Sequence, residues 1–313
     1  MKYRKLGNSE LEVPIITLGA LNFGSFCDEE KSIETIKAAI DHGVNCIDTA
    51  PTYGGMRGNS ETITGKAIKG IREQVVIATK FGTDPATSRS AIKGGGTKKY
   101  ILGAVEDSLE RLDTDYIDLY QMHFPDTETP IEETLRALED LITSGKIRFI
   151  GASNFASWQI SESGWTSLTN ELNQFVSLQT RYSILTRDME KEILPACEKH
   201  QVSLLPYFPL ESGLLTGKVT RDKEPPKGSR LALWKGAFTS EEKFNIIDKL
   251  NDYGAEIGRN ILEMSLAWTA HRSQIGSVLV GATSPEQMIQ NIDAISWNIS
   301  DEQIKAIDEI VLG

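Results

Sequence analysis

Short apolar runs alternate with longer amphipathic segments along almost the whole chain. The apolar runs predict buried β-strands at 11–20, 44–50, 75–81, 116–123, 147–154, 175–182, 203–210 and 276–282. The segments between them repeat apolar residues every three or four positions. This spacing predicts helices at 29–43, 60–70, 98–112, 131–145, 156–170, 188–200, about 240–270 and 284–294. Several of these helices end at a glycine, namely Gly43, Gly70 and Gly145.

Strands rich in Val and Ile that alternate with helices of this length are typical of parallel βαβ units. Eight such units favour an α/β fold, a (β/α)8 TIM barrel made by a single domain over residues 1–313. An open doubly wound sheet would usually carry G-x-G-x-x-G after its first strand, and this sequence has none. The cluster KGGGTKK at 93–99 follows no predicted strand and lacks P-loop spacing, so we interpret it as a mobile loop.

A long excursion, residues 211–238, follows the seventh predicted strand and includes the Pro- and Gly-rich stretch DKEPPKGS at 222–229. Long loops at this end of a barrel tend to bind ligands rather than to mark domain boundaries. Between 211 and 236 there are six Lys or Arg residues and three Asp or Glu residues, a local charge of +3 in a chain of −11. We therefore expect this loop to cover an anionic cofactor.

The composition is that of a globular protein, with 40% hydrophobic and 25% charged residues among 313. A net charge of −11 and a pI near 5.0 argue against a general nucleic-acid binder. The three cysteines are odd in number and far apart, which suits a reducing compartment. The sequence shows no secretory core and no apolar run long enough for a membrane helix. We expect a cytoplasmic enzyme with no nucleic-acid or membrane partner.

Polar residues gather where the predicted strands end, which is where barrels of this type build their chemistry. In chain order these residues, with the glycine that ends the eighth strand, are Asp48 and the nearby Tyr53, Lys80, His123, Ser153 and Asn154, Gln179, Tyr207 and Gly281. The histidines provide an internal comparison, because His42, His200 and His271 are at helix ends while only His123 follows an apolar strand.

Lys80 follows four apolar residues in a six-residue strand, and a buried ammonium without a partner is very costly. Asp48, at the same depth on the adjacent strand, is the obvious counter-ion. A free phenol titrates near pH 10, so Tyr53 needs a lower pKa to donate a proton quickly near neutrality, and a nearby ammonium provides this by stabilising phenolate. His123 can orient the substrate. These four groups suit the protonation of a carbonyl oxygen, and the hydride then requires a nicotinamide cofactor.

Two loops offer places for a dinucleotide, because barrel phosphate sites commonly form after strands seven and eight. The first reads PLESGLLTGK at 209–218 and the second VGATSPEQMIQN at 280–291, with a helix start that has free N–H donors. The residues that we expect to bind the cofactor in these loops are Pro209, Leu210, Gly213, Leu215, Gly217, Lys218, Gly281, Thr283, Ser284, Gln287 and Asn291. Ser153, Asn154 and Gln179 can hold a carboxamide, and Tyr207 can stack on a nicotinamide ring.

These blocks together resemble the aldo-keto reductase superfamily. GVNCIDTAPTYGG is similar to its G-x-x-x-x-D-T-A-x-x-Y-G signature, and VVIATKF, LYQMH, GASNF and PYFPLESGLLTGK are similar to its later blocks in family order. The match runs nearly end to end. The resemblance implies a catalytic tetrad of Asp48, Tyr53, Lys80 and His123 with Tyr53 as general acid. It also implies an extended NADPH and the reduction of aldehydes or ketones to alcohols.

The sequence departs from the family in the block after strand eight, where many members carry Lys or Arg for the 2′-phosphate. Here GATSPEQMIQN has no basic residue, unless Arg230 reaches it from the long loop. We still expect NADPH to be preferred over NADH. For the substrate we expect an apolar mouth that accepts a small or medium carbonyl compound. Its predicted residues are Phe23, Met56, Phe81, Phe124 and Trp234.

Other functions are weighed against this one. A lysine at a strand end could form a Schiff base, as in barrel lyases. A glycosidase needs two carboxylates across a cleft, and a metal hydrolase needs several ligands, whereas only Asp48 and His123 stand out here. No metal site is expected. The superfamily also contains potassium-channel β subunits, so a nucleotide-binding regulatory subunit or redox sensor is the main alternative to an enzyme.

Overall fold

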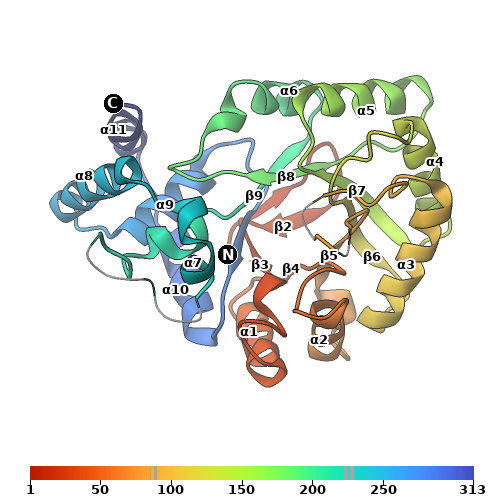
Figure 1. Cartoon of the computed structure of the whole chain (residues 1–313), viewed down its shortest axis with the longest axis horizontal. Coiled ribbons are helices and arrows are strands. Elements are labelled where there is room, and N and C mark those ends of the chain that lie inside the picture. Colours follow the sequence, from red (N-terminus) through yellow and green to blue (C-terminus); the bar gives the residue numbers. More distant parts are fainter. Residues whose placement is uncertain (85, 88–89, 222–224, 226–228) are drawn as a thin grey trace.

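The computed structural model describes residues 1–84, 86–87, 90–221, 225 and 229–313, without the side chains of 234, 235 and 237. Within this part of the chain, eight parallel strands form a sheet in the order β10-β3-β4-β5-β6-β7-β8-β9 (Figure 1). The strands are β3 (Ile16–Gly19), β4 (Cys46–Asp48), β5 (Val76–Phe81), β6 (Ile117–Met122), β7 (Ile147–Ser153), β8 (Ser177–Arg181), β9 (Ser203–Tyr207) and β10 (Val278–Gly281). A bridge between Leu204 of β9 and Ile275 brings the two edges together. The predicted (β/α)8 barrel is confirmed.

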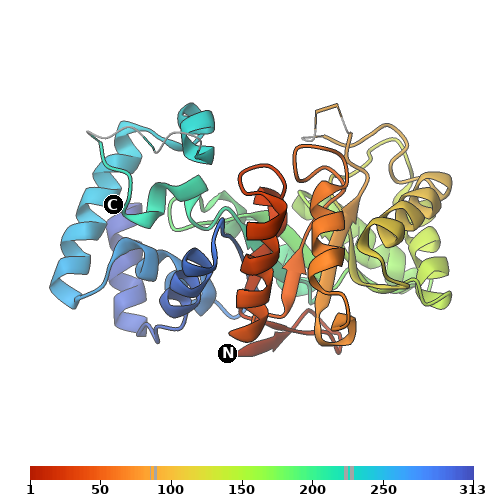
Figure 2. The ribbon, with the colours of Figure 1, turned by 90° about the horizontal axis from the view of Figure 1, so that it is seen from below.

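Helices surround the strands. They are α1 (Glu29–Asp41), α2 (Asn59–Ala67), α3 (Lys98–Leu112), α4 (Ile131–Thr143), α5 (Ser157–Thr169), α6 (Ile193–Lys199), α7 (Arg230–Phe238), α8 (Glu241–Ile257), α9 (Ile261–His271), α10 (Pro285–Ile295) and α11 (Asp301–Leu312). Short 3-10 helices are η1 (Ala20–Asn22), η2 (Arg72–Gln74), η3 (Asp188–Glu190) and η4 (Glu211–Thr216). Figures 1 and 2 both place α8 and α11 side by side, on the opposite side of the molecule from α3 and α4.

A hairpin of β1 (Tyr3–Lys5) and β2 (Glu12–Pro14) lies at the end of the barrel opposite α7, at the bottom of Figure 2. Its apolar side chains are buried against the inward-facing residues of the strands. This small core is made of Leu6, Leu11, Val13, Cys46, Ala78, Leu119, Leu205 and Leu279. Burial of this apolar surface seals the amino-terminal end, so the opposite end is left for a ligand.

Because every second side chain of a strand points into the barrel, a second layer lies above this apolar one, and it is polar. Two residues after Ala78 on β5 comes Lys80, and two residues after Leu119 on β6 comes Gln121. The register pairs Lys80 with Gln121, so both side chains enter the barrel at the same level. A polar floor therefore lies directly above the apolar plug.

Several elements differ from the sequence prediction. The first predicted strand, 11–20, is divided between β2 of the hairpin and β3 of the barrel. Helix α6 covers only the end of the predicted helix 188–200. The patterns did not predict α7, which lies within the 211–238 excursion, or α11. Most of the stretch 222–229 lies outside the described residues.

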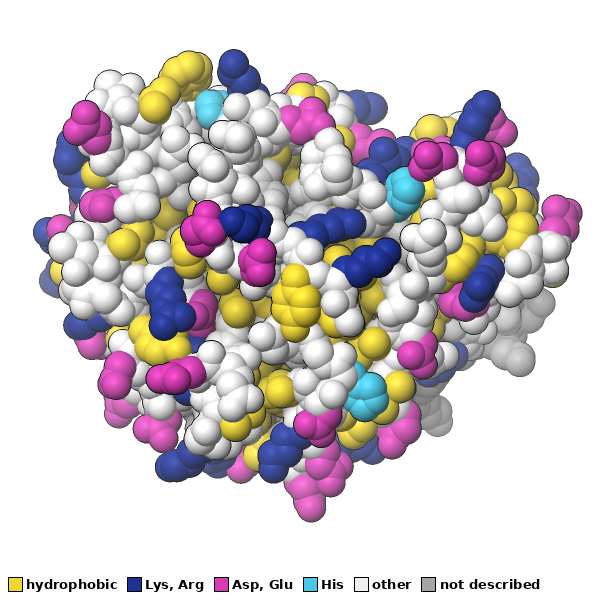
Figure 3. Space-filling view, turned by 180° about the vertical axis from the view of Figure 1, so that it is seen from behind, with side chains coloured by type: hydrophobic (Ala, Val, Ile, Leu, Met, Phe, Trp, Pro, Cys, Tyr) yellow, Lys and Arg dark blue, Asp and Glu magenta, His cyan; other side chains and the backbone are white. Residues whose placement is uncertain are grey.

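Charged side chains of both signs are mixed over the face of the molecule seen in Figure 3. Among the described residues, no helix combines the length and the apolar character needed to cross a bilayer.

Candidate active site

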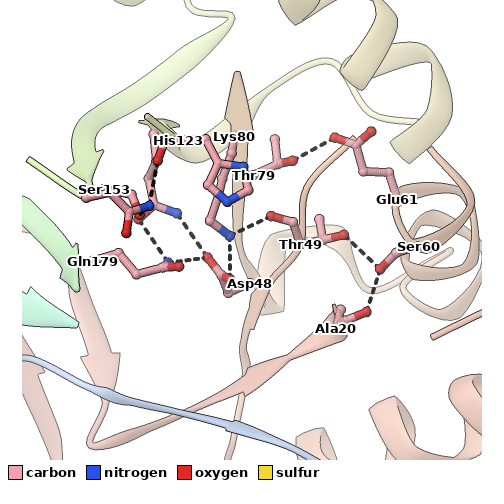
Figure 4. A network of polar contacts seen from close by, with 12 residues as sticks. Ala20, Asp48, Thr49, Ser60, Glu61, Thr79, Lys80, His123, Ser153 and Gln179 are labelled. Carbon is pink, nitrogen blue, oxygen red and sulfur yellow. Dashed lines mark hydrogen bonds and ion pairs between the residues drawn. The ribbon is translucent and has the colours of Figure 1, made fainter. Parts of the chain in front are cut away.

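The centre of the polar floor is an ion pair between Lys80 and Asp48 (Figure 4). Nζ of Lys80 lies 2.6 Å from Oδ2 of Asp48 and donates a second hydrogen bond to the carbonyl of Thr49 at 2.9 Å. Lys80 is fully buried and Asp48 nearly so. A buried ammonium is tolerated only with such compensation, so the geometry fixes where the amine stands.

The other oxygen of Asp48 receives two amide donors. Oδ1 accepts from Nε2 of Gln179 at 2.8 Å and from Nε2 of Gln121 at 3.0 Å. The carboxylate thus holds side chains from three further strands, β5, β6 and β8. This makes Asp48 the hub of the polar floor.

Tyr53 lies in the turn between β4 and α2. Its backbone N–H donates to the carbonyl of Ala50, and Gly54 follows it with a φ of 96°, a conformation that suits glycine. Nζ of Lys80 lies 4.8 Å from the centroid of the Tyr53 ring. The ring meets His123 edge-on with 5.9 Å between centroids. The four side chains of the predicted tetrad are therefore brought together.

Burial and neighbouring charges act in opposite directions on the pKa of Lys80 and on the pKa of Tyr53. Burial lowers the pKa of Lys80, but Asp48 and Tyr53 raise it by more, so the amine stays an ammonium. Burial raises the pKa of Tyr53, and the charge of Lys80 and a hydrogen bond from it only partly offset this rise. The net pKa of the phenol is above its ordinary 10.0. This corrects the expectation of a lowered value: the desolvated site outweighs the ammonium, and Tyr53 is a neutral phenol at pH 7.

His123 is a neutral imidazole. Burial and then the charge of Lys80 hold its pKa well below the ordinary 6.5. Its ring stacks on Phe124 with 5.0 Å between centroids, and no described residue hydrogen-bonds its Nδ1. The imidazole can therefore give or accept a hydrogen bond in the cavity without carrying charge.

Asn154 connects three strand ends through its own amide. Nδ2 donates to the carbonyl of His123 at 2.9 Å and to Oγ of Ser153 at 3.1 Å, and Oδ1 accepts from the hydroxyl of Tyr207 at 2.8 Å. Both Nδ2 hydrogens are used, so Asn154 orients its neighbours. The hydroxyl proton of Ser153 and Oε1 of Gln179 are the groups left for a ligand.

One cavity of about 1190 Å³ opens above this floor. Its wall includes most of the residues predicted to bind a cofactor, namely Ser153, Asn154, Gln179, Tyr207, Pro209, Leu210, Gly213, Lys218, Arg230, Gly281, Thr283, Gln287 and Asn291. The wall does not include Leu215, Gly217 or Ser284. Leu215 is fully buried in the core, Gly217 ends η4, and Ser284 caps α10 by accepting from the N–H of Gln287.

The segment after β9 is held in an unusual backbone path by Glu211. Glu211, Ser212 and Gly213 all have positive φ, at 47°, 58° and 109°. The fully buried carboxylate of Glu211 accepts from Arg181 at 2.8 Å and from Lys243 at 2.7 Å. Burial raises its pKa, but these partners lower it by more, so Glu211 remains charged. The ion pairs offset the backbone strain at Glu211 and Ser212, whereas Gly213 adopts its positive φ without strain.

Arg230 reaches the block after β10, which has no cation of its own. Nη2 of Arg230 lies 3.2 Å from the position that a Cβ would take on Gly281. Its guanidinium carbon lies 5.4 Å from the ring centroid of Phe208. No carboxylate of a described residue pairs with it, and burial lowers its pKa to about 10. Arg230 can therefore offer a positive charge beside Gly281.

The predicted substrate residues are placed differently from one another. Phe124 lines the cavity. Phe23 and Phe81 belong to the core and do not line it, because both rings are buried between strands and helices. Met56 is 73% exposed and is also absent from the wall. The side chain of Trp234 lies outside the described residues.

Two residues that sequence reasoning missed belong to the site. Gln121 completes the polar floor, and its alternation with Leu119 and His123 could have indicated that it faces inward. Asn22 lines the cavity, and its buried Oδ1 accepts no hydrogen bond from a described residue. In the described ranges, no three His, Cys, Asp or Glu side chains are grouped closely enough to hold a metal ion.

Comparison with known proteins shows what this chain is similar to. The model of the aldo/keto reductase family matches residues 15–312. Aldo-keto reductase YhdN of Bacillus subtilis is 34% identical over 99% of this chain and 94% of its own length. NADH-specific methylglyoxal reductase of Escherichia coli is 36% identical over 99% of this chain and 98% of its own. A putative voltage-gated potassium channel subunit beta of Schizosaccharomyces pombe is 33% identical over 99% and 93%.

The buried ion pair predicts a large effect on stability. Asp48→Asn leaves the ammonium of Lys80 without a counter-ion, so the free energy of unfolding should fall by about 3–5 kcal/mol in urea titrations. The matched variant Asp48→Asn/Lys80→Met removes the orphaned charge and should recover most of that loss. A single variant that is as stable as the wild type would show that Asp48 does not compensate Lys80.

Proposed function

We propose that this chain, which belongs to the aldo/keto reductase family of oxidoreductases, reduces aldehydes or ketones to alcohols. Tyr53 supplies the proton and a nicotinamide cofactor supplies the hydride. The observation that carries the proposal is the fully buried Lys80 ammonium, held by Asp48 and placed beside the ring of Tyr53 on the floor of the cavity.

Tyr53 is suited to act as the general acid. Its phenol is neutral at pH 7, so the proton is present, and the ammonium of Lys80 stabilises the phenolate that remains after the proton has left. Each unit by which Lys80 lowers the pKa of Tyr53 corresponds to about 1.36 kcal/mol of this stabilisation. Asp48 keeps Lys80 charged and in place.

His123 positions the carbonyl group. As a neutral imidazole beside the Tyr53 ring, it can donate a hydrogen bond to the carbonyl oxygen without acting as a stronger acid than Tyr53. Phe26, Phe124 and Leu21 in the cavity wall give the mouth an apolar character. These residues support a small or medium carbonyl compound as the substrate.

The cavity wall fits a nicotinamide cofactor. Oε1 of Gln179 is an acceptor and the hydroxyl of Ser153 is a donor, which together match the two ends of a carboxamide. Tyr207 is held by Asn154 at the cavity wall, where an aromatic face can pack on a flat ring. When bound, the reduced cofactor supplies the hydride that no side chain can provide.

We propose NADPH as the preferred cofactor. Lys218 and Arg230 are cations of the cavity wall, whereas Asp48, already paired with Lys80, is the one acid among the described wall residues. Arg230 is a cation near Gly281, and a phosphate group would pair with such a charge. The relative from Escherichia coli is named as NADH-specific, so parallel assays with both cofactors are the deciding experiment.

The structure bears on two other activities. A Schiff-base lyase requires a neutral amine to attack the carbonyl, and the raised pKa of Lys80 opposes this. A regulatory or redox-sensor role is raised by the relative named as a putative potassium channel subunit beta. Such a subunit would bind the cofactor but turn over slowly, so the turnover rate separates it from an enzyme. For the reductase we propose a cytoplasmic location.

Tyr53→Phe tests the proton donor. The variant lacks the acidic proton, so reduction of an aldehyde panel should fall by about 10²–10⁴-fold while the dissociation constant of the cofactor stays close to that of the wild type. Tyr120→Phe is the matched control, because the Tyr120 hydroxyl is buried, lies outside the cavity wall and has no described hydrogen-bond partner. Good turnover by Tyr53→Phe would exclude Tyr53 as the acid.

The pH profile follows from the directions of the pKa shifts. His123 takes up a proton only well below pH 6.5, and Tyr53 loses its proton only above pH 10.0. The rate of single-turnover reduction should therefore be constant between the pKa of His123 and that of Tyr53. It should fall above the pKa of Tyr53, because the phenolate cannot donate a proton. A rate that falls with a midpoint near pH 7.5 would contradict this assignment.

A further inference from the structure

Gln121 is a completely buried glutamine at the centre of the polar floor. In the strand register it is paired with Lys80 on one side and with Gly151 on the other. A Cβ on Gly151 would lie 3.2 Å from Cγ of Gln121 and 2.6 Å from Oγ of Ser177. The glycine thus leaves the space that the Gln121 side chain fills. A buried amide is costly unless it is hydrogen-bonded, so its partners are informative.

Gln121, Gln179 and Asp48 form a closed ring of hydrogen bonds. Nε2 of Gln121 donates to Oδ1 of Asp48 at 3.0 Å, and its Oε1 accepts from Nε2 of Gln179 at 3.3 Å. Nε2 of Gln179 also donates to Oδ1 of Asp48, at 2.8 Å. Gln179 lines the cavity and Gln121 does not. Gln121 therefore touches no ligand and can act only through its neighbours.

This ring of hydrogen bonds fixes the orientation of the Gln179 amide. Oδ1 of Asp48 and Oε1 of Gln121 are both acceptors, so only the NH₂ group of Gln179 can face them. A rotated amide would bring three oxygens together. No described residue donates a hydrogen bond to Oε1 of Gln179. Oε1 of Gln179 therefore faces the cavity, and this acceptor favours a ligand that has an N–H donor at that point.

We propose that Gln121 is a positioning residue that orients Gln179 and so makes the cavity select the carboxamide NH₂ of the nicotinamide ring. This inference rests on the proposed function, because it assumes a nicotinamide cofactor. A residue of β6 that does not contact the cofactor would thus contribute to its recognition.

The test compares two dinucleotides that differ at this group, NADP⁺ and its 3-acetylpyridine analogue, whose acetyl group has no N–H donor. Their dissociation constants are measured by calorimetry for the wild type, Gln121→Met and Ser177→Ala. In Gln121→Met the amide of Gln179 keeps its bond to Asp48 but loses its second acceptor, so its orientation is held by one hydrogen bond instead of two. We expect the preference for NADP⁺ over the analogue to fall roughly five-fold, mainly through weaker binding of NADP⁺.

Ser177→Ala is the matched control. Ser177 lies beside Gln121 in the same part of the barrel interior, and its buried hydroxyl has no described hydrogen-bond partner. The preference should be unchanged in this variant.

Gln121→Glu provides a second route to the same answer if Gln121→Met does not fold. A protonated carboxyl group at this position keeps one donor and one acceptor, so the preference should approach that of the wild type at low pH. An ionised carboxylate still accepts from the NH₂ group of Gln179, so the preference should also be kept at higher pH, even where repulsion from Asp48 weakens the binding of both dinucleotides. A preference lost in Gln121→Glu would contradict the role of the acceptor.

The outcomes separate the inference from the function. An unchanged preference in Gln121→Met, or an equal loss of affinity for both dinucleotides, would overturn the role of Gln121 and leave the proposed reductase in place. A wild-type protein that binds neither of these dinucleotides would overturn the proposed preference for NADPH, and one that also fails to bind NAD⁺ would overturn the proposed function itself.

Discussion

The site depends on one constraint, the compensation of the Lys80 ammonium inside the barrel. A charge at this depth is stable only with a counter-ion and further hydrogen bonds, and Asp48 and the carbonyl of Thr49 provide them. Asp48 in turn is held by Gln121 and Gln179. The proposed proton donor and the proposed carboxamide subsite thus share one carboxylate, so a change in the position of either group also moves the other.

The barrel places this pair through its alternating side chains. The hairpin and the apolar layer fill the amino-terminal end, and the next inward positions on β4, β5 and β6 carry Asp48, Lys80 and Gln121. The loops after β9 and β10 then bring the wall of the cavity over this floor, with Glu211 fixing the first of them. The apolar layer that stabilises the barrel and the polar floor of the cavity are therefore adjacent layers of side chains.

The fold and the grouping of Asp48, Tyr53, Lys80 and His123 could be predicted from the sequence because both follow from local patterns: alternating elements, and polar residues at the ends of apolar strands. Gln121 was missed because it lies inside a strand, where only the alternation with Leu119 shows its direction. Phe23 and Phe81 were expected at the mouth, but the sequence does not tell which side of a strand end a ring will pack against. The raised pKa of Tyr53 depends on burial, which only the assembled barrel determines.

The central claim is that the ammonium of Lys80 stabilises the phenolate of Tyr53. The most direct measurement is a titration of Tyr53 by NMR with ¹³C-labelled tyrosine, in the wild type and in Lys80→Met, with Tyr53→Phe to assign the signal. The Asp48→Asn/Lys80→Met variant removes the charge of Asp48 as a control. The account predicts a pKa higher by about one to three units when Lys80 is absent. Equal Tyr53 pKa values in the wild type, in Lys80→Met and in Asp48→Asn/Lys80→Met would contradict it.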